Sequence, residues 1–156
     1  MKILRIILGA MMLIGLGACE KYEIDTESQE GFKGDFIIYD SNENPVVNVV
    51  NKGTMVLLSK SISVEGKYDI YVKKVKFDKN MPVSVDLTIP SVDMVDNIIS
   101  GENITPYTGL GPYKKRIFSQ IEGELTVDEN GNYLSLSLDM ICGDQPVTYR
   151  GVYIEE

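Results

Sequence analysis

The chain has 156 residues and a formal net charge of −8, and it contains two cysteines but neither histidine nor tryptophan. Without an imidazole, Ser-His-Asp and Cys-His nucleophiles and histidine-bearing zinc sites are excluded, and cysteines as far apart as Cys19 and Cys142 cannot form a CxxC metal clip. The excess of 23 acidic over 15 basic residues repels phosphate backbones, so nucleic acid is not expected as a partner.

The first eighteen residues have the pattern of a signal peptide. A cationic start with Lys2 and Arg5 precedes an apolar stretch at 6–16 that is too short to cross about 30 Å of hydrocarbon. The stretch ends in the letters LGAC, which resemble a bacterial lipobox. The resemblance implies cleavage before Cys19 and lipidation of that cysteine with acyl chains such as palmitate. The alternative is a plain secretory peptide, cut after Ala18, that leaves Cys19 unmodified.

Residues 20–31 read EKYEIDTESQEG and contain five acids without an apolar period, which is typical of a solvated tether. We therefore expect a signal peptide at 1–18, a lipidated cysteine with a flexible tether at 19–31, and one domain at 32–156. The first acids of the tether loosely resemble a surface-export signal of some gut bacteria. A lipid anchor in the cell outer membrane is expected, and both a surface-exposed and a periplasm-facing position stay open.

From Phe32 onward, short period-two runs bounded by turn residues indicate an all-β domain. The expected strands are 32–39, then 46–50 and 54–60 as one bulged strand or two short ones, 68–77, 81–95, 98–104, 117–127, 134–142 and 147–154. Pro90 predicts a bulge or an edge within its strand, and the segment 105–113 is a loop too rich in Pro and Gly to pair. About eight antiparallel strands close most economically into an up-and-down β-barrel, with a two-sheet sandwich as the alternative.

The clearest pair of strands flanks Asn130-Gly131, which predicts a type I′ hairpin turn with positive φ at both residues. The apolar faces of the two strands are expected to be Ile117, Ile121, Leu125 and Val127, and Leu134, Leu136, Leu138, Met140 and Cys142. Cys142 is therefore expected to be a small core residue with an unreactive thiol. An earlier alternation places Val83, Val85, Leu87 and Ile89 on one side of the 81–95 strand.

Several short motifs follow one another in an order that is similar to a known family. They are YDIYVKKVKF at 68–77, MPV at 81–83, TIP at 88–90, PY at 106–107, MICG at 140–143 and PVTYRG at 146–151. Together with the lipobox they resemble the calycin-like β-barrel lipoproteins of Bacteroides-type bacteria. The resemblance implies an eight-stranded lipocalin-like barrel and brings no catalytic set. The Gly-x-Trp signature of true lipocalins is absent, so ligand binding transfers by fold analogy alone.

The candidate ligand site is formed by Tyr107 and Tyr113, each of which follows a proline. Flat amphipathic rings suit a sugar ring or a small apolar ligand at a barrel mouth. The alternative is that both rings plug one end of the barrel.

Other charged groups predict no catalytic or metal site. The loop at 40–45 begins like a calcium loop but has Pro45 in place of the required glycine, so it is expected to be a turn, and no metal or other cofactor is expected. Carboxylates such as Asp86, Glu122 and Asp139 are expected outside the barrel, where a pKa near 4 makes a poor general acid. The cationic groups Lys73, Lys74, Lys76 and Lys79, and Lys114, Lys115 and Arg116, could meet an acidic ligand or be solvated strand edges.

We therefore expect a monomeric, lipid-anchored envelope protein that is a non-catalytic binding module for a small apolar or glycan ligand. The alternative is a structural or protein-interaction lipoprotein whose barrel is filled with side chains. Eight strands enclose an interior that either fills or holds one small ligand. Bulky rows such as 134–140 favour filling, whereas Ser119, Gly123 and Gly151 leave room if they point inward.

Overall fold

The computed structural model describes residues 31–46 and 51–155. In these residues the period-two runs form ten strands and one short 3-10 helix. The strands are β1 (Gly31–Ile38), β2 (Asn51–Lys60), β3 (Tyr68–Val75), β4 (Val85–Val95), β5 (Ile98–Ile104), β6 (Tyr107–Thr108), β7 (Gly111–Pro112), β8 (Phe118–Val127), β9 (Tyr133–Cys142) and β10 (Gln145–Ile154), and the helix is η2 (Lys114–Arg116). The predicted strand at 46–50 falls mainly on 47–50, which lie outside the described residues.

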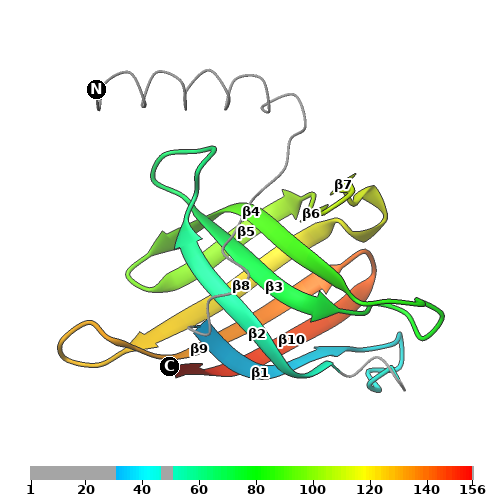
Figure 1. The fold of residues 1–156 in the computed structure, drawn as a ribbon, viewed down its shortest axis with the longest axis horizontal. Helices are drawn as coiled ribbons and strands as arrows, with labels where there is room; N and C mark the ends of the chain where they lie inside the picture. Colours follow the sequence, from blue (N-terminus) through cyan, green and yellow to red (C-terminus); the bar gives the residue numbers. More distant parts are fainter. Residues whose placement is uncertain (1–30, 47–50, 156) are drawn as a thin grey trace, which may run out of the picture.

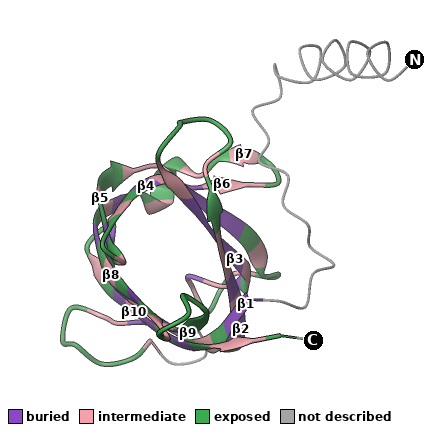
Figure 2. Cartoon of the chain, turned by 90° about the vertical axis from the view of Figure 1, so that its left-hand side faces the viewer, coloured by how far each residue is buried: buried purple, intermediate pink, exposed green. Residues whose placement is uncertain are grey.

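Eight of these strands close into an up-and-down antiparallel barrel, as predicted. The sheet runs β3-β2-β1-β10-β9-β8-β5-β4, and β3 also pairs with β4, which closes the ring (Figures 1 and 2). One closed sheet excludes the two-sheet sandwich. The strands β6 and β7 form a small ribbon beside the wall, joined to β4 at Thr88 and Tyr107. The segment 105–113, which was expected not to pair, does pair: Tyr107 lies opposite Pro112 and Thr108 opposite Gly111. The two prolines lack an amide hydrogen themselves but leave the backbone groups of Tyr107 and Thr108 free to bond.

The barrel has two ends, which we call the N-terminal end and the distal end. The N-terminal end holds the start of β1 and the connections β2–β3, β4–β5 and β8–β9. The distal end holds the connections β1–β2, β3–β4, β5–β8 and β9–β10, together with the β6–β7 ribbon. Figure 1 shows the distal connections gathered on the right.

The β8–β9 hairpin exists, but the predicted type I′ turn is wrong. Of the two central residues only Gly131 has a positive φ, at 82°. The Gly131 amide donates to the Asp128 carbonyl at 3.0 Å and the Asp128 amide donates to the Asn132 carbonyl at 2.9 Å, which describes a type I turn followed by a left-handed glycine. The Asp128 carboxylate accepts the Asn130 and Asn132 amides, and this capping favours the type I form.

Of the bulge or edge predicted at Pro90, the structure has the bulge. Tyr68 pairs with Val92 and Ile70 with Ile89, so Pro90 and Ser91 lie opposite Asp69 alone and β4 carries one extra residue there. Ser91 has a φ of 60°, and its amide donates to the buried carboxylate of Asp69 at 2.9 Å. The bulge reverses the alternation of β4, so that Val92 as well as Ile89 lies in the core.

Three residues expected on inner faces lie outside the core. Ile117 is 37% exposed because a register shift between Phe118 and Gln120 turns Phe118 inward in its place. Leu134 is also exposed, because a register shift in the β8–β9 pairing leaves it as the extra residue between Tyr133 and Ser135. Val83 is exposed because it precedes β4, which begins at Val85. The other predicted inner residues of β8 and β9, from Ile121 to Cys142, are buried or packed against the core.

Candidate functional site

The interior of the barrel is occupied by side chains from every strand of the wall. Among them is Tyr149, which exposes 0% of its surface and whose hydroxyl donates to the Thr54 carbonyl at 2.9 Å. Burial raises the pKa of the Tyr149 phenol, and the nearby charge of Asp35 adds to this effect. The phenol is therefore a neutral donor that holds the ring in one position.

Glycines in the wall make room for this ring. Tyr149 lies over Gly151 on its own strand, where a Cβ would come within 2.5 Å of the Tyr149 hydroxyl. Gly34 lies opposite Gly151 in the register and also pairs with Thr54, the acceptor residue. A Cβ at Gly34 would overlap the Arg150 carbonyl, so β1 approaches β10 more closely than a side chain permits.

The glycines that could have left a cavity are filled by neighbours instead. A Cβ at Gly123 would lie 2.6 Å from a Leu138 methyl group, and Tyr149 covers Gly151. Ser119 lies in the wall, with its hydroxyl donating to the Ile141 carbonyl. Between a filled interior and a hollow one, these contacts favour the filled interior.

Aromatic rings close both ends of the barrel. At the N-terminal end, Phe32 stacks on Tyr133 and meets Tyr153 edge-on, with ring centroids 5.7 and 5.4 Å apart. At the distal end, Phe77 meets Phe36 and Tyr113 at 6.2 and 6.1 Å. The Arg116 guanidinium lies 5.2 Å from the centre of the Phe77 ring and covers it from outside. Both mouths are therefore closed by packed rings.

The two candidate ligand residues, Tyr107 and Tyr113, lie on opposite faces of the β6–β7 ribbon. The Tyr113 amide donates to the carbonyl of the buried Pro106, and the Tyr113 ring packs on Phe77. The Tyr113 ring therefore closes the distal end. Tyr107 pairs with Thr88 of β4 and shares the outer face of the wall with it, since cross-strand partners point to the same side. The two rings do not form one platform, and ligand binding by either ring stays a prediction.

Sequence reasoning missed the buried outer face beside Tyr107. Tyr71 alternates with the inward Ile70 and Val72 and so points outward, yet it is only 5% exposed. Its cross-strand partner is Thr88, also buried. Burial raises the pKa of Tyr71, and the charge and hydrogen bond of Asp86 raise it further. No local pattern predicts this, because the pairing of β6 with β4 at Thr88 joins residues far apart in sequence.

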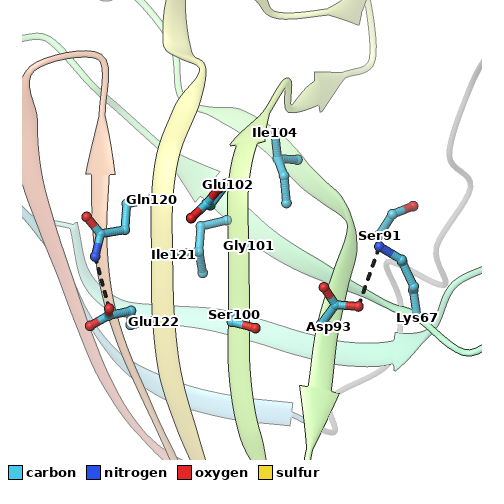
Figure 3. A pocket seen from close by; sticks show the side chains of 10 residues that line it. All are labelled: Lys67, Ser91, Asp93, Ser100, Gly101, Glu102, Ile104, Gln120, Ile121 and Glu122. Atoms are coloured by element: carbon cyan, nitrogen blue, oxygen red, sulfur yellow. Dashed lines mark hydrogen bonds and ion pairs between the residues drawn. The ribbon is translucent and has the colours of Figure 1, made fainter.

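An open cleft of about 440 Å³ lies in the wall where β4 separates from β5 (Figure 3). These strands pair only over 93–95 and 98–100. The cleft is lined by Lys67, Ser91, Asp93, Ser100, Gly101, Glu102, Ile104, Gln120, Ile121 and Glu122. Lys67 forms an ion pair with Asp93 at 3.4 Å, and the Gln120 amide donates to Glu122 at 2.9 Å. The lining is polar and can exchange hydrogen bonds.

A second open cleft, of about 460 Å³, lies at the N-terminal end. It is lined by Gly131, Asn132, Tyr133, Tyr153 and Glu155. Tyr133 is partly exposed there. One ring with an amide and a carboxylate beside it can offer both stacking and hydrogen bonds.

The carboxylates considered for acid-base chemistry make local structural contacts. Asp86 accepts the Lys74 amide at 3.0 Å, Asp139 forms a 2.8 Å ion pair with Arg150, and both members of that pair are exposed. Over residues 31–46 and 51–155, no group of three or more Cys, Asp or Glu residues could hold a metal ion. The loop at 40–45 is a turn, as predicted, in which the Asp40 carboxylate accepts two amides of its own loop.

Cys142 is buried in the core, as predicted, with 1% of its surface exposed. Its thiol donates to the Arg116 carbonyl at 3.5 Å. Burial raises the pKa of the thiol to about 12, against a smaller opposite effect of Arg116. Cys19, the predicted lipidation site, lies outside the described residues.

The comparisons with known proteins return nothing for this chain: no family model, curated protein or solved structure matches it. Within the described part of the chain, no helix is both long and apolar enough to cross a membrane.

Proposed function

We propose that the chain is a lipid-anchored protein of the bacterial cell envelope, whose calycin-like barrel acts through its outer surface on a protein partner. The observation that carries the proposal is the buried Tyr149–Thr54 hydrogen bond inside the barrel. A barrel of eight strands has room for side chains or for one small ligand. The Tyr149 ring is fully buried and bonds to a strand two positions away in the wall, within a core to which all eight wall strands contribute side chains. This packing favours the first arrangement, so we assign recognition to the outside.

The anchor is Cys19 at the end of the lipobox LGAC. Two or three acyl chains would give the stable attachment that one chain cannot. The chain from Cys19 to Gly31 spans at most about 40 Å when extended, so the barrel stays close to the membrane that holds it. The outer membrane of a Bacteroides-type bacterium fits the lipobox and the acidic tether.

The anchor is tested by Cys19→Ala, with Cys142→Ala as the matched cysteine control. The wild-type chain and the Cys142 variant are expected in the detergent-soluble membrane fraction, and the Cys19 variant is expected to lose its acyl mass and to leave that fraction. Retention of the Cys19 variant with its lipid mass would contradict the proposal. Protease treatment of intact cells separates surface display from a periplasm-facing position.

A second function, binding of a glycan or a small apolar ligand on the outside, is favoured by the cleft at the N-terminal end. Tyr133 is 36% exposed there, with Asn132 and Glu155 beside it. The pair Tyr107 and Tyr113 is the other candidate for such a ligand. In a glycan array, Tyr133→Ala and the double variant Tyr107→Ala/Tyr113→Ala separate these sites: the variant that loses a signal identifies the binding rings, and an array without any signal contradicts this second function.

A further inference from the structure

Half of the basic side chains in the described residues gather in one place at the distal end. Of the 15 Lys and Arg residues of the sequence, Lys2, Arg5 and Lys21 lie outside the described residues, which leaves twelve. Six of these twelve form what we call the distal basic cluster: Lys52, Lys76, Lys79, Lys114, Lys115 and Arg116. The three segments that carry them, 51–52, 76–79 and 113–116, contain a single carboxylate, Asp78.

Specific contacts hold these three segments together. The Asn51 side chain accepts the Lys76 amide at 3.0 Å and donates to the Lys76 carbonyl at 3.1 Å, which fixes the start of β2 against the β3–β4 connection. Phe77, the next residue, lies under the Arg116 guanidinium at 5.2 Å and against Tyr113. The Arg116 guanidinium also donates to Gln145 at 2.9 Å. The fold therefore collects cations from three distant parts of a net-acidic chain.

The two ends differ in charge. The distal connections carry Asp40, Glu43, Asp78 and Asp144 against the six cations of the cluster. The connections and chain ends at the N-terminal end carry Glu65, Asp96, Asp128, Glu129 and Glu155, with Asp93 near the end of β4, against Lys60 and Lys67 nearby. β1 begins at this acidic end. The distal basic cluster belongs to the connections on the right of Figure 1, at the other end of the barrel from the start of β1.

Exposed apolar side chains accompany the cluster. Leu110, at the tip of the β6–β7 ribbon, is 100% exposed, and the Tyr113 amide ties the base of this ribbon to Pro106 just before η2. Ile117 follows η2 and is also exposed. An exposed apolar side chain beside a group of cations suits a surface that recognises a protein of the opposite charge. An acidic polysaccharide would bind the cations but would offer no apolar side chain for Leu110 to pack against.

We propose that the distal basic cluster, together with Leu110, is the docking surface for an acidic region of a partner protein. This inference rests on the proposed function, in which the barrel acts through its outer surface. The cations speed and orient the encounter, and Leu110 enters an apolar recess among the partner's carboxylates. The contacts of Asn51 and Phe77 keep the surface formed before the partner arrives, which lowers the cost of ordering it on binding.

The test uses the mature chain in detergent and a random copolymer of glutamate and tyrosine as an acidic polypeptide probe. The triple variant Lys79→Gln/Lys114→Gln/Lys115→Gln removes three exposed charges of the cluster. The matched control Lys33→Gln/Lys60→Gln/Lys67→Gln removes the same charge elsewhere. We expect the cluster variant to lose about tenfold in affinity, the control to lose less than about threefold, and added salt to weaken wild-type binding. Equal losses in both variants would overturn the assignment of the surface.

Leu110→Ser distinguishes the class of partner. This variant is expected to weaken binding of the glutamate–tyrosine copolymer while leaving binding of polygalacturonate, a carboxylate polysaccharide, unchanged. Tighter wild-type binding to polygalacturonate, or to vesicles containing phosphatidylglycerol, would overturn the choice of a protein partner. Self-association in sedimentation velocity that the cluster variant abolishes would overturn it too, in favour of the acidic end of a second copy. Retention of the Cys19→Ala variant in the membrane fraction with its lipid mass would count against the proposed anchor alone, so the two failures are distinguishable.

Discussion

The hydroxyl of Tyr149 donates a 2.9 Å hydrogen bond to the carbonyl oxygen of Thr54, two strands away in the barrel wall. Between them lies Gly34, which pairs with Gly151 on one side and Thr54 on the other. The absence of side chains at Gly34 and Gly151 lets the Tyr149 ring lie close to the wall and reach Thr54. This arrangement fixes a buried ring inside the barrel and leads to the first two predictions.

Tyr149→Phe removes the buried donor and leaves the Thr54 carbonyl without it. We expect a loss of about 1–3 kcal/mol in the free energy of unfolding, the cost of a lost hydrogen bond with a buried group left unsatisfied. Urea denaturation measures it. Tyr39→Phe is the matched control, because its 3.3 Å contact with Thr148 is only partly buried and its loss is expected to be smaller. Equal losses for the two variants would show that the buried Tyr149 hydrogen bond contributes no more to stability than the partly buried hydrogen bond of Tyr39.

Gly151→Ala places a methyl group against the Tyr149 ring. Overpacking of this kind costs about 1–3 kcal/mol, because the ring must leave its position. Gly109→Ala is the control, since nothing lies within 4 Å of its Cβ position. Thermal unfolding of both variants gives the comparison, and an unchanged melting temperature for Gly151→Ala would contradict a filled centre.

Cys142 is expected to resist thiol reagents in the native protein. Burial raises its pKa from 9.0 to about 12, so the thiol stays protonated at pH 8 and is also covered. Maleimide labelling followed by mass analysis should show no modification until denaturant is added. Because the pKa of the thiol is higher in the folded protein than in the unfolded chain, its contribution to the free energy of unfolding is fully present below pH 9 and is lost as the pH rises toward 12. Rapid native labelling would disprove this placement.

Asp128 is expected to titrate below its usual range. The backbone amide and side chain of Asn132 and the backbone amide of Asn130 donate hydrogen bonds to the carboxylate and lower its pKa, and the nearby Gly131 amide adds to this effect. The stabilisation of the turn is therefore present above the ordinary carboxyl pKa and is lost as the pH falls through the lowered value. Carboxyl chemical shifts followed by NMR test the direction. Asp128→Ala should speed amide hydrogen exchange at residues 130–132. Asp144→Ala, in the turn between β9 and β10, should leave the exchange of those amides unchanged.

The period-two pattern was sufficient to predict the barrel, its main strands and the burial of Cys142, because each inner face repeats every second residue. It was insufficient wherever the register shifts. Phe118 replaced Ile117 in the core because the bulge near Gln120 reverses the alternation, and a bulge leaves no reliable signal in a single strand. At Pro90 the signal existed, because proline lacks the ladder donor, and the bulge was predicted.

The candidate site was harder to predict for a related reason. Tyr107 and Tyr113 both follow prolines in one short loop, yet ribbon pairing sends them to opposite faces. The runs Lys73–Lys79 and Lys114–Arg116 were visible as separate groups. That these two groups lie at the same end of the barrel as Lys52 depends on the contacts of Asn51 and Phe77, which join residues that no local pattern connects.

A barrel that is filled by its own side chains and acts from outside holds no small molecule in its interior. Native mass spectrometry of the mature chain, extracted from its own host in detergent, measures whether one is bound. We expect a mass equal to the polypeptide from Cys19 plus its covalent acyl groups, with no component released on denaturation. A bound small molecule that appears in the native spectrum and disappears on unfolding would contradict it, and would place a ligand where Tyr149 lies.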